Sequence, residues 1–187
     1  FGRWTRIDAA AHPLNVSGTA RGRLAGGNLS LLCSAIGTPE QPDFDTPTVL
    51  FIEEIGEQMY RLDRMMQQLE RSGILAKCKA VLVGHFTDML GQKHFGVWDP
   101  CDIIAAYVRP LGIPVVFGIP AGHEDPNVAL YMGREVAVTV NDAGESVEFC
   151  PQARPAGHLP PSAPSAEAFP QKIAAAGRGL VIFLLFL

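Results

Sequence analysis

Glu53 and His123 are the residues of this sequence whose types and positions favour acid–base chemistry. Glu53 ends the apolar run Thr48–Glu53, TVLFIE, and a carboxylate at the end of a buried strand must reach water or find a partner. His123 stands in the short polar segment Gly122–Asn127, and an imidazole can accept or release a proton near neutral pH. A carboxylate that orients a histidine, which in turn activates a nucleophile, supplies two of the three members of a catalytic triad.

The other acids after this strand have a simpler interpretation. Glu54 and Glu57 are expected to be solvated side chains that begin the turn into the next helix, where negative charge favours the helix N-terminus. Glu53 continues the strand pattern more closely than they do. Glu53 is therefore the acid for which we predict a fixed role.

His123 also has two other interpretations, a surface loop histidine and a metal ligand. His85, His94 and Cys101 could act as co-ligands, but no HxxxH or HExxH spacing connects any of these residues. The sequence also lacks a P-loop and a GxGxxG motif. We therefore predict no metal and no organic cofactor.

The nucleophile of such a triad is missing from the sequence. No GxSxG elbow, the turn that presents a catalytic serine, is present. Glu53 and His123 are therefore either a structural pair or served by a nucleophile on chain that lies outside this sequence. The side chains considered for the role lie in predicted helices, turns or the last strands: Ser17, Ser30, Ser34, Ser72, Ser146 and Cys33.

A second group with chemical potential is the segment Gly26-Gly27-Asn28, directly before a predicted helix. Two glycines let backbone N–H groups approach a ligand closely, and the N-terminal end of a helix favours an anion or a carboxylate. The alternative is a tight strand-to-helix turn in which Asn28 only caps the helix. Both interpretations remain open from the residues alone.

These residues need a scaffold, and the sequence alternates strand and helix patterns from residue 28 to residue 117. Such alternation implies an α/β layer with right-handed crossovers, and the residues after it are typical of a small antiparallel meander. The predicted helices begin at Asn28, Glu57 and Asp99, and the predicted strands span residues 48–53, 79–86, 114–117, 128–132, 135–140 and 146–149.

Composition limits the class of protein. Of the 187 residues, 48% are hydrophobic and 18% are charged, which is enough to bury a core. The net charge is −4, and the absence of a dense Lys/Arg run argues against a nucleic-acid partner. The apolar end Leu180–Leu187 is too short for a stable membrane span. The four cysteines form no CxxC pair and are expected to be reduced thiols in a reducing compartment.

Three zones follow from the changes in composition along the chain. Residues 1–20 show no periodicity and are expected to be a lead-in or linker, and the missing initiating Met suggests that they continue a longer protein. Residues 21–150 form the predicted domain. Residues 151–187 are expected to be a Pro-rich disordered tail with an apolar end, produced by a frame shift, a read-through or a lineage-specific extension.

Several motifs in order resemble the C-terminal domain of the LD-carboxypeptidases, or muramoyltetrapeptide carboxypeptidases, from about Arg21 to Phe149. The motifs are GRLAGGNLSLLCSAIGTPEQPDF, VLFIEEIGEQMYRLDRMMQQLERSGIL, KAVLVGHFTD and GIPVVFGIPAGHEDPNVALYMG. The resemblance implies a swivelling-type α/β domain with a mixed sheet and a small antiparallel meander. It also implies that Tyr60, Asp63 and Arg64 hold a helix to the domain by packing and an ion pair.

The family resemblance also implies a function. In that family an N-terminal domain carries the serine of a Ser-His-Glu triad, so Glu53 and His123 would be the other two members, and Gly26, Gly27 and Asn28 would line the substrate cleft. The parent enzyme would remove a terminal D-amino acid, D-Ala, from a muropeptide in the cytoplasm during peptidoglycan recycling. The serine-bearing domain is missing here, so we expect this chain alone to be inactive.

Two alternatives remain beside this interpretation. The first is an immunity-type peptidase of the same family that acts on a peptide-nucleotide antibiotic. The second is a non-catalytic binding module that has lost its nucleophile. In each case the face left bare by the missing domain would favour self-association, for which a homodimer is one form.

Overall fold

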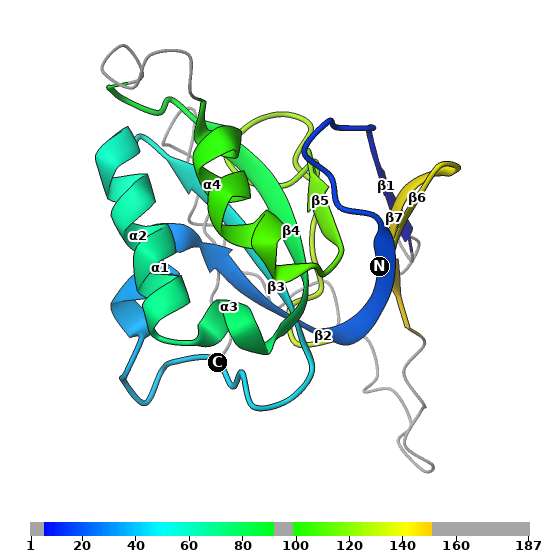
Figure 1. Cartoon of the computed structure of the whole chain (residues 1–187), viewed down its shortest axis with the longest axis horizontal. Coiled ribbons are helices and arrows are strands. Elements are labelled where there is room, and N and C mark those ends of the chain that lie inside the picture. Colours follow the sequence, from blue (N-terminus) through cyan, green and yellow to red (C-terminus); the bar gives the residue numbers. More distant parts are fainter. Residues whose placement is uncertain (1–5, 92–98, 151–187) are drawn as a thin grey trace, which may run out of the picture. The chain divides into compact units, whose positions relative to one another are not determined.

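The protein is described here by a computed structural model that covers residues 6–91 and 99–150 (Figure 1). Within these ranges a single mixed sheet carries helices on one face. The elements are β1 (Arg6–Ala9), β2 (Gly18–Asn28), α1 (Leu29–Ala35), β3 (Thr48–Ile55), α2 (Met59–Arg71), α3 (Ile74–Lys77), β4 (Cys78–Thr87), α4 (Pro100–Val108), the 3-10 turn η2 (Arg109–Leu111), β5 (Val115–Phe117), β6 (Glu135–Asn141) and β7 (Gly144–Phe149).

The seven strands lie in the order β1-β7-β6-β2-β3-β4-β5. Strands β2, β3, β4 and β5 are parallel to one another, whereas β6 and β7 form an antiparallel hairpin that joins β2 on one side and β1 on the other. The predicted α/β fold with a mixed sheet is therefore confirmed. The carboxyl ends of the parallel strands share one edge of the sheet, where α/β folds usually place their functional groups.

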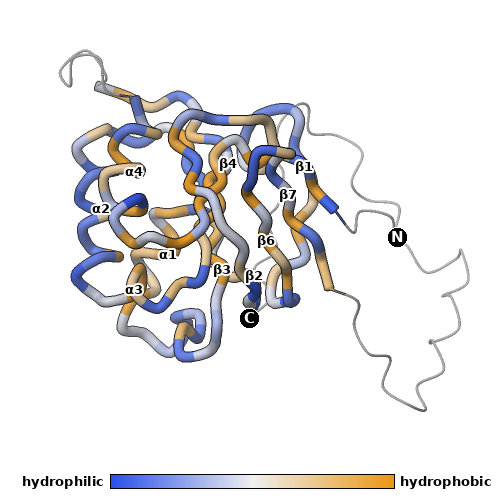
Figure 2. Tube along the Cα trace, turned by 45° about the vertical axis from the view of Figure 1, so that its right-hand side comes forward, coloured by the Kyte–Doolittle hydropathy of each residue, from blue (hydrophilic) through white to orange (hydrophobic). Residues whose placement is uncertain are grey.

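The pleat of β3 divides the core between the two faces of the sheet. Leu50 and Ile52 belong to the cluster shared with the helices, and Val49 and Phe51 belong to the cluster on the other face. Successive side chains of a strand point to opposite faces, which explains this division. In Figure 2 the helices lie together on one side of β2, β3 and β4, and apolar residues concentrate between the layers.

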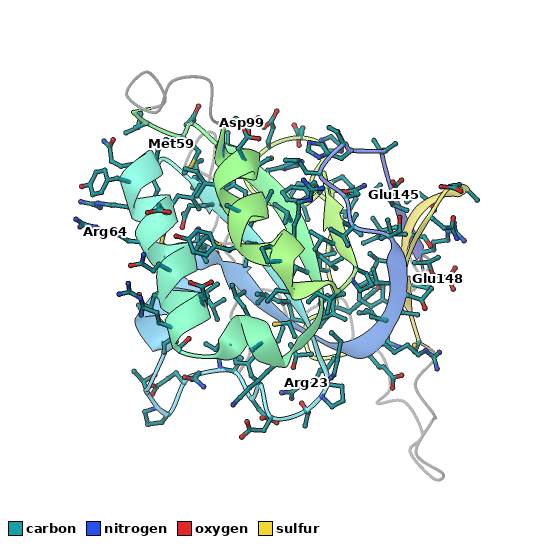
Figure 3. All side chains as sticks on the ribbon, in the orientation of Figure 1. Arg23, Met59, Arg64, Asp99, Glu145 and Glu148 are labelled. Carbon is teal, nitrogen blue, oxygen red and sulfur yellow. The ribbon has the colours of Figure 1, made fainter. Side chains whose placement is uncertain are left out.

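The predicted helix starts are confirmed within two residues. Asn28 caps α1 by accepting a hydrogen bond from the N–H of Leu31, and Asp99 forms a reciprocal capping box with Asp102 at the start of α4. Figure 3 shows Asp99 and Met59 at the starts of their helices. α2 begins at Met59 rather than at Glu57, because its buried stripe begins there.

Residues 1–20 were expected to be a lead-in or linker, and the part that the structure describes contains two strand segments. Residues 6–9 form β1, and β2 already begins at Gly18. β2 is the strand that joins the parallel and antiparallel halves of the sheet. Its glycines and arginines conceal the strand pattern, because glycine and charged residues are uncommon in strands. Pairing with the partner strands β3 and β6 compensates for this low strand propensity.

Asn15 and Val16 tie this first segment to two other parts of the sheet. The Asn15 side chain donates to Glu145 Oε1 at 3.0 Å on β7 and accepts from the Phe117 N–H at 2.8 Å on β5. Val16 exchanges two backbone hydrogen bonds with Val115, at 3.1 and 3.2 Å. The segment therefore satisfies part of the open edge of β5 and connects it to the hairpin.

Residues 128–132, predicted as a strand, form no strand. The Val128 N–H donates to Pro120 O at 2.8 Å, and the Gly133 N–H donates to Leu24 O at 2.8 Å. These single contacts anchor an irregular segment to a loop and to β2 instead of forming a ladder. Tyr131 packs edge-on against Phe149 at 5.2 Å, which explains the apolar character of the segment.

The helix pair α2 and α4 is joined by a hydrogen bond rather than by the predicted ion pair. Tyr107 on α4 donates to Asp63 at 2.7 Å, and Arg64 lies over the Tyr60 ring at 5.2 Å. Arg64 projects away from the domain in Figure 3.

No helix within residues 6–91 and 99–150 is long and apolar enough to cross a membrane. The predicted tail 151–187 and His94 lie outside the described residues.

The contacts of Asn15 generate a stability prediction. Asn15→Ala should lower the free energy of unfolding by about 1–3 kcal/mol, because it leaves the Phe117 N–H without its acceptor. Urea denaturation followed by circular dichroism measures the change. The matched control is Asn141→Ala, which removes one local bond in an exposed turn and should cost less than about 1 kcal/mol. Equal losses of unfolding free energy in both variants would contradict the role of Asn15 in connecting β5 to β7.

Burial makes a second prediction, on cysteine reactivity. Burial raises the pKa of the Cys33 and Cys101 thiols to about 11 and that of Cys78 to about 12, so the reactive thiolate is scarce at neutral pH. We expect iodoacetamide to modify these three thiols slowly in the native chain and rapidly in denaturant, as mapped by mass spectrometry. Fast modification of Cys78 in the native chain would contradict the packing described above.

Candidate active site

The structure brings Glu53 and His123 into direct contact across 70 residues of sequence. The distance from His123 Nδ1 to Glu53 Oε2 is 2.6 Å. The Glu53 side chain is 1% exposed, whereas the His123 side chain is 32% exposed. A buried carboxylate thus holds the inner edge of an imidazole that still reaches solvent.

The hydrogen bond determines which imidazole nitrogen can act as a base. An ionised carboxylate only accepts hydrogen bonds, so Nδ1 of His123 carries the proton when Glu53 is ionised. In the neutral imidazole Nε2 is then the basic atom. This arrangement of carboxylate, Nδ1 and Nε2 is the one that general-base catalysis by a triad requires.

The segment after β5 reaches Glu53 because Gly84 has no side chain. The Ile119 N–H donates to Val83 O and the His85 N–H donates to Ala121 O, both at 3.0 Å, so residues 119–121 run along the end of β4. A Cβ on Gly84 would collide with the Ala121 carbonyl and would lie 2.8 Å from the Phe51 ring. Any larger residue at position 84 would therefore push the loop away from β3 and β4.

Gly122 and Asn127 then fix the conformation of the backbone next to His123. Gly122 has φ +138°, and a Cβ there would lie 3.0 Å from His85 Cβ and 3.3 Å from Glu53 Cβ. The side chain of Asn127 accepts from the Gly122 N–H at 3.2 Å and donates to Gly122 O at 2.6 Å. The loop is thus fixed at the residue that immediately precedes His123.

Gly26, Gly27 and Asn28 form the end of β2, beside Glu53. Asn28 pairs with Glu53 in the register of β2 and β3. The two glycines serve different purposes. A Cβ on Gly26 would collide with the Phe51 carbonyl, so Gly26 permits close strand packing, whereas a Cβ on Gly27 would meet nothing within 4 Å. Of these two glycines, Gly27 is therefore the one that borders open space.

The prediction that Glu54 is solvated is wrong. Its side chain is 2% exposed and accepts hydrogen bonds from Asn28 Nδ2 at 2.7 Å, the Ser30 N–H at 2.8 Å and the Ile55 N–H at 3.0 Å. The reason is that β3 continues to Ile55, so Glu54 lies within the strand and faces α1. Glu57 is partly exposed and pairs with Arg61 at 3.5 Å, close to its expected behaviour.

The serines and the cysteine of α1 and its neighbours have partners of their own. Ser30 donates to Asn28 at 2.7 Å, and Ser34 and Ser72 donate to backbone carbonyls. Burial raises the pKa of the Cys33 thiol to about 11, and its Sγ donates to Met65 O at 3.6 Å. None of these four is activated as a nucleophile by these contacts.

Within residues 6–91 and 99–150, no group of three or more His, Cys, Asp or Glu side chains is arranged to hold a metal ion. Of the co-ligands considered above, His85 lies on β4 and Cys101 lies in the first turn of α4. The site that the structure assembles is therefore a pair of acid–base groups beside a polar strand end.

Three residues of the site were not predicted, namely Glu54, Gly84 and Asn127. A signal for Glu54 was present, because two successive carboxylates inside a strand must point to opposite faces of the sheet. Gly84 and Asn127 gave no such signal. Their roles depend on which loop crosses the end of β4, and that is a tertiary property.

Comparison with known proteins identifies the family. The sequence model of the LD-carboxypeptidase C-terminal domain matches residues 21–138. A putative carboxypeptidase of Synechocystis is 37% identical over 127 residues, which are 68% of this chain and 42% of that protein. A probable murein peptide carboxypeptidase of Bacillus subtilis is 35% identical over 133 residues, which are 71% of this chain and 41% of that protein.

Solved structures agree with these matches. The crystal structure of muramoyltetrapeptide carboxypeptidase from Oxalobacter formigenes superposes with a TM-score of 0.69 at 33% identity, over 78% of this chain and 49% of that chain. Among the sequence relatives, the microcin C7 self-immunity protein of Escherichia coli is 26% identical over 133 residues, which are 70% of this chain and 38% of that protein. The chain thus spans less than half the length of the relatives it matches. It belongs to the LD-carboxypeptidase family, of which it contains the C-terminal domain.

Proposed function

We propose that this chain is the C-terminal part of a serine-type LD-carboxypeptidase that removes a terminal D-Ala from murein tetrapeptides in peptidoglycan recycling. The observation that carries the proposal is the 2.6 Å contact between His123 Nδ1 and buried Glu53. The names of the relatives, a murein peptide carboxypeptidase and a muramoyltetrapeptide carboxypeptidase, support the substrate class.

In the proposed reaction the serine comes from an N-terminal domain outside the 187 residues of this sequence. Its hydroxyl attacks the carbonyl carbon of the L,D-peptide bond while His123 Nε2 takes the proton, and Glu53 stabilises the imidazolium that forms. The tetrahedral intermediate then expels the D-Ala amine, which receives the same proton from His123. Water hydrolyses the acyl-enzyme with His123 again as the base. No metal or organic cofactor takes part in these steps.

The edge of the sheet that holds the site suits contact with a further domain. Three large apolar residues there are exposed to solvent: Leu31 is 54% exposed, Ile55 38% and Leu90 50%. Exposed apolar groups that gather beside a site favour an interface. We propose that the serine-bearing domain covers them, with Gly26, Gly27 and Asn28 lining the cleft for the peptide. In its absence the same side chains would favour a homodimer.

The proposed compartment is the cytoplasm. The four cysteines are free, in keeping with reducing surroundings. Recycled murein peptides would be met there as soluble substrates.

A second candidate function rests on one specific relative. The microcin C7 self-immunity protein matches 70% of this chain, so a protein of immunity to microcin C7 uses a related domain. The candidate function is an immunity-type peptidase that acts on a peptide-nucleotide antibiotic. Glu53 and His123 would serve both substrates equally. Assay of the intact protein with a murein tetrapeptide and with an aminoacyl-nucleotide compound separates the two functions. A chain that cleaves neither would point to a non-catalytic binding module.

The triad assignment gives the first functional prediction. In an enzyme in which this chain is joined to the serine-bearing domain, Glu53→Gln should lower kcat about 10³- to 10⁴-fold, because the amide favours the wrong imidazole tautomer. Release of D-Ala from the tetrapeptide measures the rate, and circular dichroism checks the fold. Glu57→Gln, which alters a nearby acid outside the pair, should change kcat less than about twofold. A Glu53→Gln enzyme with nearly full activity would refute the triad.

The absence of a predicted nucleophile from this sequence gives the second functional prediction. The 187-residue chain alone should release no D-Ala from a murein tetrapeptide, and addition of a serine-bearing domain should restore release. A serine-to-alanine variant of that added domain is the control. Turnover by the chain alone would overturn the proposal that its nucleophile lies elsewhere.

A further inference from the structure

Glu54 is a buried carboxylate that the proposed mechanism does not use. It lies next to Glu53 on β3 but on the opposite face, toward α1, where its side chain is 2% exposed. Both of its oxygens are occupied by donors. Oε1 accepts from Asn28 Nδ2 at 2.7 Å and from the Ile55 N–H at 3.0 Å, and Oε2 accepts from the Ser30 N–H at 2.8 Å.

These contacts determine the orientation of the Asn28 amide. Asn28 Oδ1 accepts from the Leu31 N–H at 3.2 Å and from the Ser30 hydroxyl at 2.7 Å, so both of its lone pairs are used. Asn28 Nδ2 must face Glu54, because a carboxylate only accepts. A flipped amide would set its oxygen against Glu54 and its nitrogen against the Leu31 N–H. The arrangement therefore permits one orientation.

The same count shows what Asn28 can offer to a ligand. Its amide nitrogen has two hydrogens, of which one is donated to Glu54. The oxygen has no remaining capacity. Asn28 therefore presents one N–H donor and no acceptor, beside Gly27, whose Cα borders open space.

We propose that Glu54 is a positioning residue of the active site, which holds Asn28 so that this side chain binds a carbonyl or carboxylate oxygen of the substrate. The proposal rests on the proposed function, because it takes Asn28 as part of the peptide cleft. β3 then serves both halves of the site. Glu53 orients the proton-transferring histidine on one face, and Glu54 orients the substrate-binding amide on the other.

Only a carboxylate can accept from all three partners at once, whereas an amide would leave at least one of them facing an NH₂ group. All three partners of Glu54 are donors. Glu54→Gln therefore sets its own NH₂ group either against the Ser30 N–H or against Asn28 Nδ2 and the Ile55 N–H. In the second arrangement Asn28 would flip and would lose its cap on Leu31.

The first test is spectroscopic and needs no turnover. In ¹H–¹⁵N spectra of the full 187-residue chain, one side-chain amide proton of Asn28 should lie downfield and exchange about tenfold or more slowly than its geminal partner. Glu54→Ala, which removes both acceptor oxygens, should abolish this difference, and Glu57→Ala should retain it. Equal exchange of the two protons in the unmodified chain overturns the proposal, as does an unchanged difference in Glu54→Ala. If Glu54→Ala does not fold, the spectrum of the unmodified chain decides.

The second test separates positioning from chemistry in the enzyme joined to the serine-bearing domain. Glu54→Ala should raise KM for the tetrapeptide about three- to tenfold, the effect of one lost hydrogen bond, with kcat within about twofold. A fall in kcat with unchanged KM overturns the role of Glu54. Failure of the proposed function can be distinguished from failure of the role of Glu54. Full activity in Glu53→Gln would contradict the proposed function, whereas the Asn28 spectrum tests the role of Glu54 independently of activity.

Discussion

The burial of two adjacent carboxylates at the end of β3 is the constraint on which the site depends. A carboxylate removed from water is costly unless it is hydrogen-bonded, so each must find donors from other parts of the chain. Glu53 finds the His123 imidazole, and Glu54 finds Asn28 and two backbone N–H groups. Because successive strand residues point to opposite faces, the two acids recruit two different segments, and both segments meet at one edge of the sheet.

Two glycines, Gly84 and Gly26, allow the segments that carry these contacts to lie close together, because glycine has no side chain. Gly84 lets the segment after β5 lie against the end of β4, and Gly26 lets β2 lie close to β3. Asn15 bonds to both β5 and β7 and so connects strands that are remote in the strand order. The first segment is thus part of the domain, and packing at several separate points holds the elements of the site together.

Much of the fold could be predicted, because its elements carry local signals. The buried run at β3, the capping residues Asn28 and Asp99 and the stripe of α2 each specify an element without reference to the rest of the chain. β2 was missed because glycines and arginines hide its alternation, and residues 128–132 were mistaken for a strand because their apolar residues pack against other elements. Both errors concern segments whose structure depends on partners.

The sequence by itself determined the types of acid–base group, the alternation of helices and strands from α1 to β5 and the family to which the motifs belong. Only the tertiary structure decided that Glu53 meets His123, that Glu54 is buried and that Gly27 rather than Gly26 borders open space. The physical reason is that local propensity depends on near neighbours in sequence. Burial and hydrogen-bond partners depend instead on residues that are, for Glu53 and His123, 70 positions apart.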